Sequence, residues 1–310
     1  YTFIAEPGRT PTSLREWLLA NPDCSRLEKL FETFGPNWWM QRRPYTFRLA
    51  QEYDRVLPTH LVVEPGAGPG RTLDGRISPS ELDIRVGETV TLRNFSQMER
   101  RADGRSLSLR GRQVAGQPVL RVRWQGLTNP NGASGRVVAT RWTLLREWTA
   151  NFDLRGLPDP LERLAGVLNE TVSGTQAVIH GDLNLENVLM GPGDFVWLID
   201  FAQTREGHAL FDFAHLYAEI VAHILAPQLP SADDYLHLLN NPEQSSFHTL
   251  YALLTTLDKI AGRCLFNPSQ PREYHLAKFV SCLGALKFAN LTYSARYLLT
   301  LTAAHTGQNL

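Results

Sequence analysis

The sequence is poor in cysteine and in long apolar runs, and each shortage excludes a class of protein. Cys24, Cys264 and Cys282 are its only cysteines, and their wide, unpaired spacing argues against a disulfide framework or a zinc knuckle. No stretch is apolar for long enough to cross a bilayer, and the first residues lack the basic and apolar segments of a signal peptide. We therefore expect a cytoplasmic protein that has no membrane partner.

Acidic and basic residues are equal in number over the whole chain, but they are distributed unevenly along it. Residues 93–146 hold 11 Lys and Arg against 2 Asp and Glu, whereas residues 147–310 hold 9 against 17. A solvated β-rich surface balanced by an acidic neighbour would explain this asymmetry. A face that binds a polyanion is the alternative.

Hydrophobic periodicity divides the chain into three parts, residues 1–56, 57–146 and 147–310. Apolar residues recur at spacings of three and four over residues 13–53, which predicts helix. The middle part has short β-type runs between turn clusters, with good alternation over residues 83–92, and predicts a small antiparallel sheet or barrel. The last part is helical except for short strands near residues 177–199.

The segment that carries chemistry is HGDLNLENVL at residues 180–189, and Asp200 follows eleven positions later within LIDF. Phosphoryl transfer needs a carboxylate that orients or deprotonates the acceptor hydroxyl, and oxygen ligands that hold Mg²⁺ on the nucleotide phosphates. Asp182 and Asn187 share one loop, and a hairpin formed by residues 188–190 and 195–199 would return Asp200 to it. We therefore expect these three side chains to converge.

This segment resembles the catalytic and metal-binding loops of the aminoglycoside phosphotransferase and choline kinase branch of the protein-kinase-like fold. The resemblance implies that Asp182 is the catalytic base or hydroxyl-orienting group, and that Asn187 and Asp200 are the Mg²⁺ ligands. It further implies that His180 braces the loop and that Asp212, at the start of a helix, supports the loop backbone.

One position departs from the branch, which commonly has a His where this chain has Asn184. An amide can still form hydrogen bonds, so the change leaves the loop detail and the substrate preference open.

The sequence WLIDFA at residues 197–202, the Gly207-His208 pair and the large β-rich insert are more similar to the ternary complex associated kinase-like domains of bacterial conflict systems. The resemblance to the kinase-like branch covers residues 1–56 and 147–310 and leaves the insert outside. It implies an α+β fold, with a mostly helical protein-kinase-like large lobe and a β-rich insert that could resemble an oligonucleotide-binding fold. It also implies ATP and Mg²⁺ as cofactors, a hydroxyl-bearing substrate of unknown identity, and protein partners from a multi-component system.

The sequence lacks a recognisable small kinase lobe with its glycine-rich loop and strand lysine. All four lysines fall in helical patterns, and the glycine run at residues 65–70 lacks the following helix that a phosphate cradle needs. The opening residues resemble the hinge strand that follows the small lobe. On this interpretation Phe3 and Ile4 contact the nucleotide, and the small lobe precedes Tyr1.

Three functions stay open: an active phosphotransferase, a pseudokinase scaffold, and a module that binds nucleic acid or a protein partner through the basic insert. For nucleic acid, Phe95 and Trp124 are the candidate stacking residues. His215, Glu219 and His223 recur four apart and could bind zinc, although an ordinary helix surface is the simpler explanation.

Overall fold

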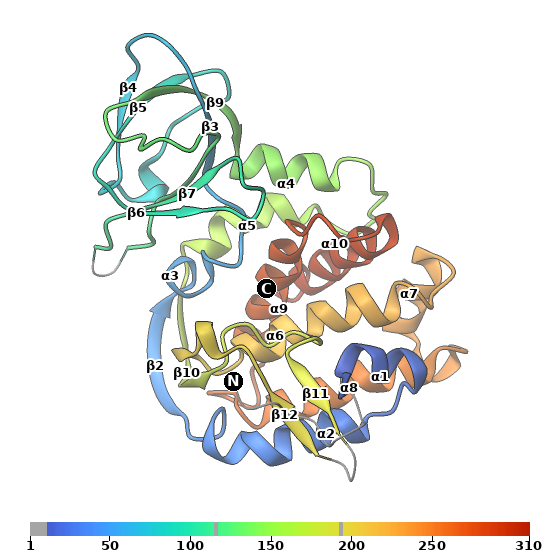
Figure 1. Cartoon of the computed structure of the whole chain (residues 1–310). Coiled ribbons are helices and arrows are strands. Elements are labelled where there is room, and N and C mark those ends of the chain that lie inside the picture. Colours follow the sequence, from blue (N-terminus) through green and yellow to red (C-terminus); the bar gives the residue numbers. More distant parts are fainter. Residues whose placement is uncertain (1–10, 115–116, 192–194) are drawn as a thin grey trace. The chain divides into compact units, whose positions relative to one another are not determined.

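The computed structural model describes residues 11–114, 117–191 and 195–310, and it is a mixed α+β structure (Figure 1). The chain forms two compact units. The helical unit comprises the chain up to Phe47 together with Phe152–Val167 and Thr171–Leu310. The barrel unit comprises Arg48–Asn151 and Leu168–Glu170.

Helices make up most of the helical unit. They are α1 (Leu14–Ala20), α2 (Ser25–Phe34), α5 (Pro160–Leu168), α6 (Phe211–Ile220), α7 (Ala232–Asn240), α8 (His248–Gly262), α9 (Arg272–Ala285) and α10 (Tyr293–Gly307). Side-chain caps fix several starts: Ser13 and Glu16 form a reciprocal capping box at α1. Thr292 accepts a hydrogen bond from the Ala295 N–H at the start of α10. The helical pattern expected after residue 210 is confirmed.

Two small sheets accompany these helices. Strands β1 (Thr12–Ser13), β11 (Val188–Met190) and β12 (Val196–Leu198) form one antiparallel sheet, and the hairpin expected from the sequence is confirmed as β11 and β12. The other sheet has the order β13-β10-β2, with β13 at Arg205–His208, β10 at Thr171–Ile179 and β2 at Arg43–Arg48. The helix expected throughout residues 13–53 is therefore wrong at β2, where tertiary pairing with a distant strand overrides the local pattern.

Helix α9 lies at the centre of the helical core. All residues of α9 are buried except Arg272 and His275. The helix packs against α6 and α10. The buried Lys278 ammonium is paired with Asp258 at 3.1 Å and lies over the rings of Tyr217 and Tyr274. This charge is therefore neutralised within the core.

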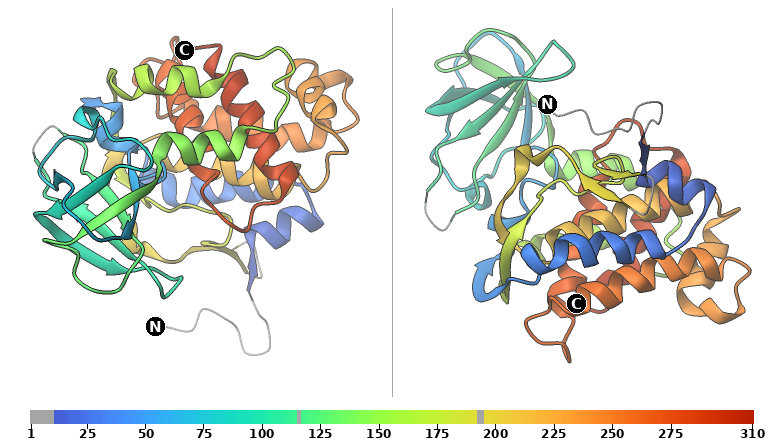
Figure 2. Two further views of the ribbon diagram at one scale, coloured as in Figure 1. Left: turned by 90° about the horizontal axis from the view of Figure 1, so that it is seen from above. Right: turned by 60° about the horizontal axis from the view of Figure 1, so that its bottom comes forward.

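The barrel unit contains a seven-stranded sheet with two short helices, α3 (Leu49–Tyr53) and α4 (Arg141–Thr149). The strand order is β4-β5-β9-β3-β8-β7-β6. These strands are β3 (Leu61–Pro65), β4 (Arg71–Asp74), β5 (Thr89–Arg93), β6 (Phe95–Arg100), β7 (Leu107–Gly111), β8 (Arg121–Trp124) and β9 (Ser134–Thr140). Figure 2 shows how the strands curl around a common interior.

Two pairings in this sheet differ from the antiparallel arrangement expected from the sequence. Strands β3 and β8 are parallel, as are β4 and β5. Strand β5 also begins only at Thr89, because the alternating residues 83–88 before it form a loop and a turn. The barrel is thus a mixed sheet, and its seven strands exceed the five of an oligonucleotide-binding fold.

Close backbone contact brings the two ends of the sheet together. The Gly75 carbonyl after β4 accepts a hydrogen bond from the Arg112 N–H after β7, at 3.0 Å. A Cβ atom on Gly111 would collide with that same Gly75 oxygen, so only glycine permits the approach. The sheet is therefore nearly closed.

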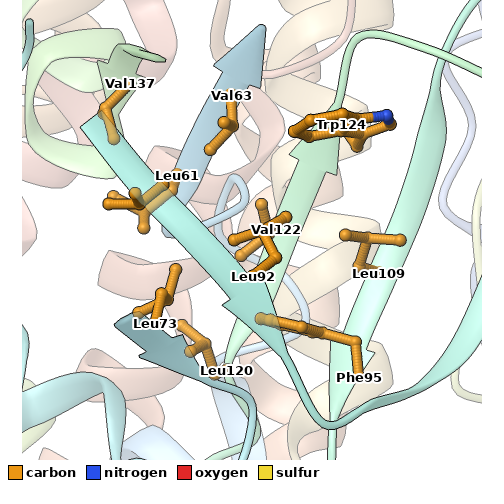
Figure 3. Packing of buried hydrophobic residues seen from close by; sticks show 11 residues of the cluster. Leu61, Val63, Leu73, Leu92, Phe95, Leu109, Leu120, Val122, Trp124 and Val137 are labelled. Carbon is orange, nitrogen blue, oxygen red and sulfur yellow. The ribbon is translucent and has the colours of Figure 1, made fainter. Parts of the chain in front are cut away.

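The barrel interior is filled by apolar side chains that alternate along the strands (Figure 3). The core comprises Leu61, Val63, Leu73, Val90, Leu92, Phe95, Leu109, Leu120, Val122, Trp124 and Val137. Phe95 and Trp124 are 3% and 1% exposed, so neither can stack on a base without leaving the core. The insert therefore lacks the stacking residues that the nucleic-acid hypothesis assigned to it.

A buried ionic cluster fastens α3 and α4 to the barrel. Asp54 accepts hydrogen bonds from Arg121 at 2.9 Å and from Arg141 at 2.7 Å, and both guanidinium groups also donate to backbone carbonyls near Pro58. Burial would raise the pKa of Asp54, but the charges of Arg141 and Arg121 and the hydrogen bond from His60 hold that pKa well below its usual range. The carboxylate is therefore ionised in the folded barrel unit.

Among the residues that the structure describes, no helix has the length and apolarity that crossing a bilayer would require.

Candidate functional site

The candidate site is built on the loop of residues 180–187 between β10 and β11, called here the Asp182 loop. Gly181 has a φ of 79°, and a Cβ atom at this position would collide with the backbone oxygen of Gln203. Both features require glycine. The second residue of the HGD motif therefore lets the loop pack against the segment that follows Asp200.

Asp182 and Asn187 lie together in this loop. The Asn187 amide nitrogen donates to the Asp182 carbonyl at 2.8 Å and lies 3.5 Å from the Asp182 carboxylate. Asn184 fixes the turn between them, since its side-chain oxygen accepts from the backbone N–H groups of Glu186 and Asn187 at 3.0 and 2.9 Å. The amide at Asn184 thus supplies loop hydrogen bonds, as expected for this departure from the branch.

The β11 and β12 hairpin carries the chain from Asn187 to Asp200. Val188 is opposite Leu198, and the Ile199 N–H donates to the Asn187 carbonyl at 3.0 Å. The Ile199 carbonyl in turn accepts from the His180 ring at 2.8 Å. Because Asp200 directly follows Ile199, its backbone is held against both ends of the Asp182 loop.

Asp200 itself is exposed and adopts the left-handed conformation, with φ at 60° and ψ at 64°. Asp tolerates this region better than most residues, and non-glycine residues held in it often mark functional positions. The strand therefore ends in a turn that leaves the carboxylate at the surface.

His180 joins the start of the Asp182 loop to the end of the hairpin. Its Nε2 faces a carbonyl oxygen, which can only accept, so the ring proton is on Nε2. The Trp38 ring stacks on the His180 ring at 6.2 Å and contacts the Phe201 ring at 5.9 Å. These aromatic contacts hold the imidazole in the orientation that bonds Ile199.

Asp212 supports the start of the loop from the first turn of α6. Its carboxylate accepts from the backbone N–H groups of His180 and Gly181 at 2.6 and 2.8 Å, and from the Trp39 indole at 2.7 Å. Complete burial raises the pKa of Asp212, while the three donors act in the opposite direction. The Asp212 carboxylate thus binds the backbone at the start of the Asp182 loop.

Trp39 is a supporting residue that the sequence analysis missed. Trp39 is fully buried. A buried indole N–H needs a hydrogen-bond acceptor, so a tryptophan expected in the core could have been predicted to bond a polar group there. The sequence could not identify Asp212 as that acceptor, because the two residues lie on different elements.

The arrangement suits a hard cation held with nucleotide phosphates. Since the Asn187 nitrogen faces Asp182, its amide oxygen is the atom that can ligate a metal, and the Asp200 carboxylate is an oxygen ligand. Mg²⁺ is commonly bound by one or two protein oxygens together with substrate phosphates. The residues present therefore fit this ion.

The zinc alternative at His215, Glu219 and His223 gains no support. Over residues 11–114, 117–191 and 195–310, no three His, Cys, Asp or Glu side chains gather as a metal site. Glu219 and His223 lie 3.8 Å apart and are largely buried rather than on a free helix surface.

Two expectations from the sequence concern nucleotide contacts: Phe3 and Ile4 would contact the nucleotide, and no lysine lies on a strand that could pair with the phosphates. Phe3 and Ile4 lie outside the described residues. The four lysines are all described, and none lies on a strand: Lys29, Lys259 and Lys278 are on helices, and Lys287 follows α9.

Comparison with known proteins gives one family match. No curated protein sequence matches the chain. Among solved structures, an ethanolamine kinase from Plasmodium vivax is 12% identical, with 69% of this chain and 83% of that chain covered and a TM-score of 0.26. A likeness at that level does not establish a common fold.

The family match is with ternary complex associated domain 9 and spans residues 1–278. It runs through the barrel unit, and it confirms the resemblance to the ternary complex associated domains that the sequence indicated. The match also includes the Asp182 loop, Asp200 and Asp212. The chain belongs to the ternary complex associated domain 9 family.

Proposed function

We propose that this chain is the large lobe of an ATP- and Mg²⁺-dependent phosphotransferase of the protein-kinase-like kind. The observation that carries the proposal is that one loop holds Asn187 against Asp182, while the hairpin that follows this loop ends next to Asp200. Asn187 contacts Asp182, and Asp200 follows the residue that bonds both Asn187 and His180. Phosphoryl transfer depends on such positioning more than on covalent chemistry.

Each residue has a distinct task in this proposal. Asp182, half-buried in the loop, orients the acceptor hydroxyl and receives its proton. Asn187 and Asp200 hold Mg²⁺, which supplies charge neutralisation to the transferring phosphates when bound. His180 and Asp212 keep the loop in register without touching the substrate.

The test uses the whole protein as encoded, with hydrolysis of [γ-³²P]ATP in the presence of Mg²⁺ as the probe, since water can replace an unidentified acceptor. Asp200→Ala is expected to abolish hydrolysis while circular dichroism and the melting temperature stay unchanged. Asp233→Ala removes an exposed carboxylate on α7 and is the matched control. Undiminished hydrolysis by a folded Asp200→Ala protein would refute the assignment.

The same assay separates catalysis from a scaffold role. A pseudokinase scaffold would bind Mg²⁺-ATP, observed by isothermal titration calorimetry, without turnover in any variant. Turnover in the unmodified protein that depends on Asp182 excludes that alternative.

A nucleic-acid role for the barrel unit would have to depend on exposed arginines alone. Arg121 and Arg123 are engaged by Asp54 and Asp103 at 2.9 Å each, and the two candidate stacking rings are buried. Binding of a single-stranded oligonucleotide that weakens steeply with salt would support this role, because phosphate contacts release counterions. Absence of binding at low salt would eliminate it.

A further inference from the structure

Strand β6 forms an open edge of the barrel sheet. It is the last strand in the sheet order, and among the described strands it pairs with β7 only. The close contact between Gly75 and Gly111 lies at the start of β6, because Gly111 is the partner of Phe95. A bulge between Phe95 and Gln97 follows directly. The open part of the edge is therefore residues 97–100, and an unpaired edge of this kind is a template for another strand.

The backbone of β6 presents hydrogen-bonding groups along this edge. The Arg101 N–H donates to the Ser106 carbonyl across the turn to β7, at 2.9 Å. Backbone groups of alternate residues point to the same side of a strand, so those of Glu99 also face β7, whereas those of Met98 and Arg100 face outward. Within the parts of the chain that the structure describes, the N–H groups of Met98 and Arg100 have no backbone acceptor. An extended peptide can pair with both residues.

The side chain of Met98 adds an apolar contact to this edge. Met98 is opposite Leu109, which is opposite Val122, so the three side chains form one row on the interior face of the sheet. Leu109 and Val122 are fully buried in the barrel core (Figure 3), whereas Met98 is 36% exposed. The row is thus covered at β8 and β7 and uncovered at β6. An added strand with an apolar side chain beside Met98 would bury it.

Arginines surround the open edge, and few acidic residues balance them. Residues 93–112 contain six arginines, two acidic residues and no lysine. Asp103, one of the two acids, is engaged by Arg123 at 2.9 Å and by the Ser106 hydroxyl at 2.6 Å. All six arginines are exposed, and none of them forms an ion pair within the described chain. They are Arg93, Arg100, Arg101, Arg105, Arg110 and Arg112.

The two outward residues indicate which side chains a partner strand would carry. Arg100 lies two positions after Met98 and therefore on the same face of the sheet. A strand that places an apolar residue beside Met98 and an acidic residue two positions away is complementary to both. The Glu99 side chain lies on the opposite face, across from Ser108, so it does not oppose this acidic residue.

We propose that the open edge of β6 binds an extended, acidic peptide segment of a partner protein, which adds a strand to the barrel sheet. Main-chain pairing aligns the segment, and the arginines supply charge complementarity. Single-stranded nucleic acid fits less well, because it has no peptide groups to pair in strand register and the rings of Phe95 and Trp124 are buried. The proposal concerns the barrel unit and does not depend on the phosphotransferase assignment.

The probe is the blocked peptide acetyl-Thr-Glu-Thr-Val-Thr-Glu-Thr-amide, used with the whole protein. Its sequence is the same in both directions, so a parallel and an antiparallel strand both place Val beside Met98 and Glu beside Arg100. Amide hydrogen exchange by NMR compares the free and the peptide-saturated protein. The amides of Met98 and Arg100 should exchange at least about tenfold more slowly with the peptide, because they gain acceptors. The Glu99 amide already faces β7 and should change by less than about twofold.

Substitutions at the edge test the same contacts through the anisotropy of fluorescein-labelled peptide. Met98→Pro removes one outward N–H and no bond to β7, and should weaken binding at least about tenfold. Met98→Ala keeps this N–H and should weaken binding only about threefold. Arg100→Glu reverses a complementary charge and should weaken binding about tenfold. Arg85→Glu, an equal charge change in the loop before β5, is the matched control and should stay within about twofold.

Several results would overturn the proposal. Absence of binding, equal binding of a peptide with Lys in place of Glu, or a bound peptide that leaves the Met98 and Arg100 amides unprotected would each do so. Equal affinity of Met98→Pro and Met98→Ala would exclude main-chain pairing. Oligothymidylate that binds more tightly than the peptide, with the same affinity for Met98→Pro, would assign the arginines to nucleic acid instead. The exchange measurement uses the unmodified protein, so it decides the question even where a variant does not fold.

Discussion

The barrel unit should lose stability in mild acid through one buried histidine. His60 is 8% exposed, its Nδ1 accepts from the backbone N–H of Arg121 at 3.0 Å, and its Nε2 lies 3.0 Å from the Asp54 carboxylate. Because the Arg121 N–H can only donate, Nδ1 carries no proton and the ring is neutral. Burial and the charge of Arg141 lower the pKa of His60 to about 4, although Asp54 acts in the opposite direction.

The magnitude follows from the two protonation equilibria. The unfolded chain binds this proton with a pKa near 6.5, so between pH 6.5 and pH 4 it holds more protons than the folded chain. The contribution of neutral His60 to stability is therefore fully present above pH 6.5 and is lost as the pH falls through the folded pKa. The free energy of unfolding should drop by about 2 kcal/mol between pH 7 and pH 5, and by about 3 kcal/mol below pH 4.

The assay compares the unmodified protein with His60→Gln, which cannot take up a proton. Hydrogen exchange of peptides that span residues 107–124, measured across a urea series, reports unfolding of the barrel unit alone. The loss between pH 7 and pH 5 should be about 2 kcal/mol smaller in His60→Gln, whatever its stability at pH 7. His237→Gln, at an exposed position on α7, should behave like the unmodified protein. Equal losses in all three proteins would refute the reasoning.

Four further substitutions test other parts of the structure. Asp54→Asn leaves two buried guanidinium groups without a counter-charge and should cost the barrel unit about 3–5 kcal/mol in the same exchange assay; a cost below about 1 kcal/mol would contradict this. Trp39→Phe removes one donor from buried Asp212 and should lower the free energy of unfolding of the helical unit by about 1–3 kcal/mol, measured by chemical denaturation, where no change would count against the bond. Gly181→Ala should reduce ATP hydrolysis and lower the melting temperature, whereas Gly262→Ala, whose Cβ enters open space on α8, should raise stability by about 0.5–1 kcal/mol; the opposite order would be inconsistent with the geometry.

Local signals in the sequence were sufficient for the hairpin that carries the site. Residues 188–190 and 196–198 are two short apolar runs on either side of the sequence GPGD, which is typical of a turn, so pairing needs no information from elsewhere in the chain. Strand β2 is different, because RPYTFR has no clear period and becomes a strand through pairing with β10, more than a hundred residues away. The parallel pairs in the barrel were missed for the same reason, since periodicity identifies strands and not their partners.

The buried positions of Phe95 and Trp124 had a readable signal that the nucleic-acid hypothesis did not use. In β8 the order Arg121, Val122, Arg123, Trp124 alternates charged and apolar residues, and such alternation places the tryptophan on the face of Val122. The side chains of Arg121 and Arg123 then point away from the barrel interior, where Asp54 and Asp103 bind them. The composition suggested a basic groove, whereas alternation within the strand indicated a core residue.

Glu219 shows where sequence reasoning about a site stops. The spacing of His215, Glu219 and His223 predicted one face of a helix, and in the structure Glu219 near the end of α6 lies 3.8 Å from His223 in the π-helical turn that follows. Periodicity cannot say what that face packs against, and a free surface and a buried contact give the same pattern. The same face carries Asp212, whose role was expected because the resemblance supplied its partner.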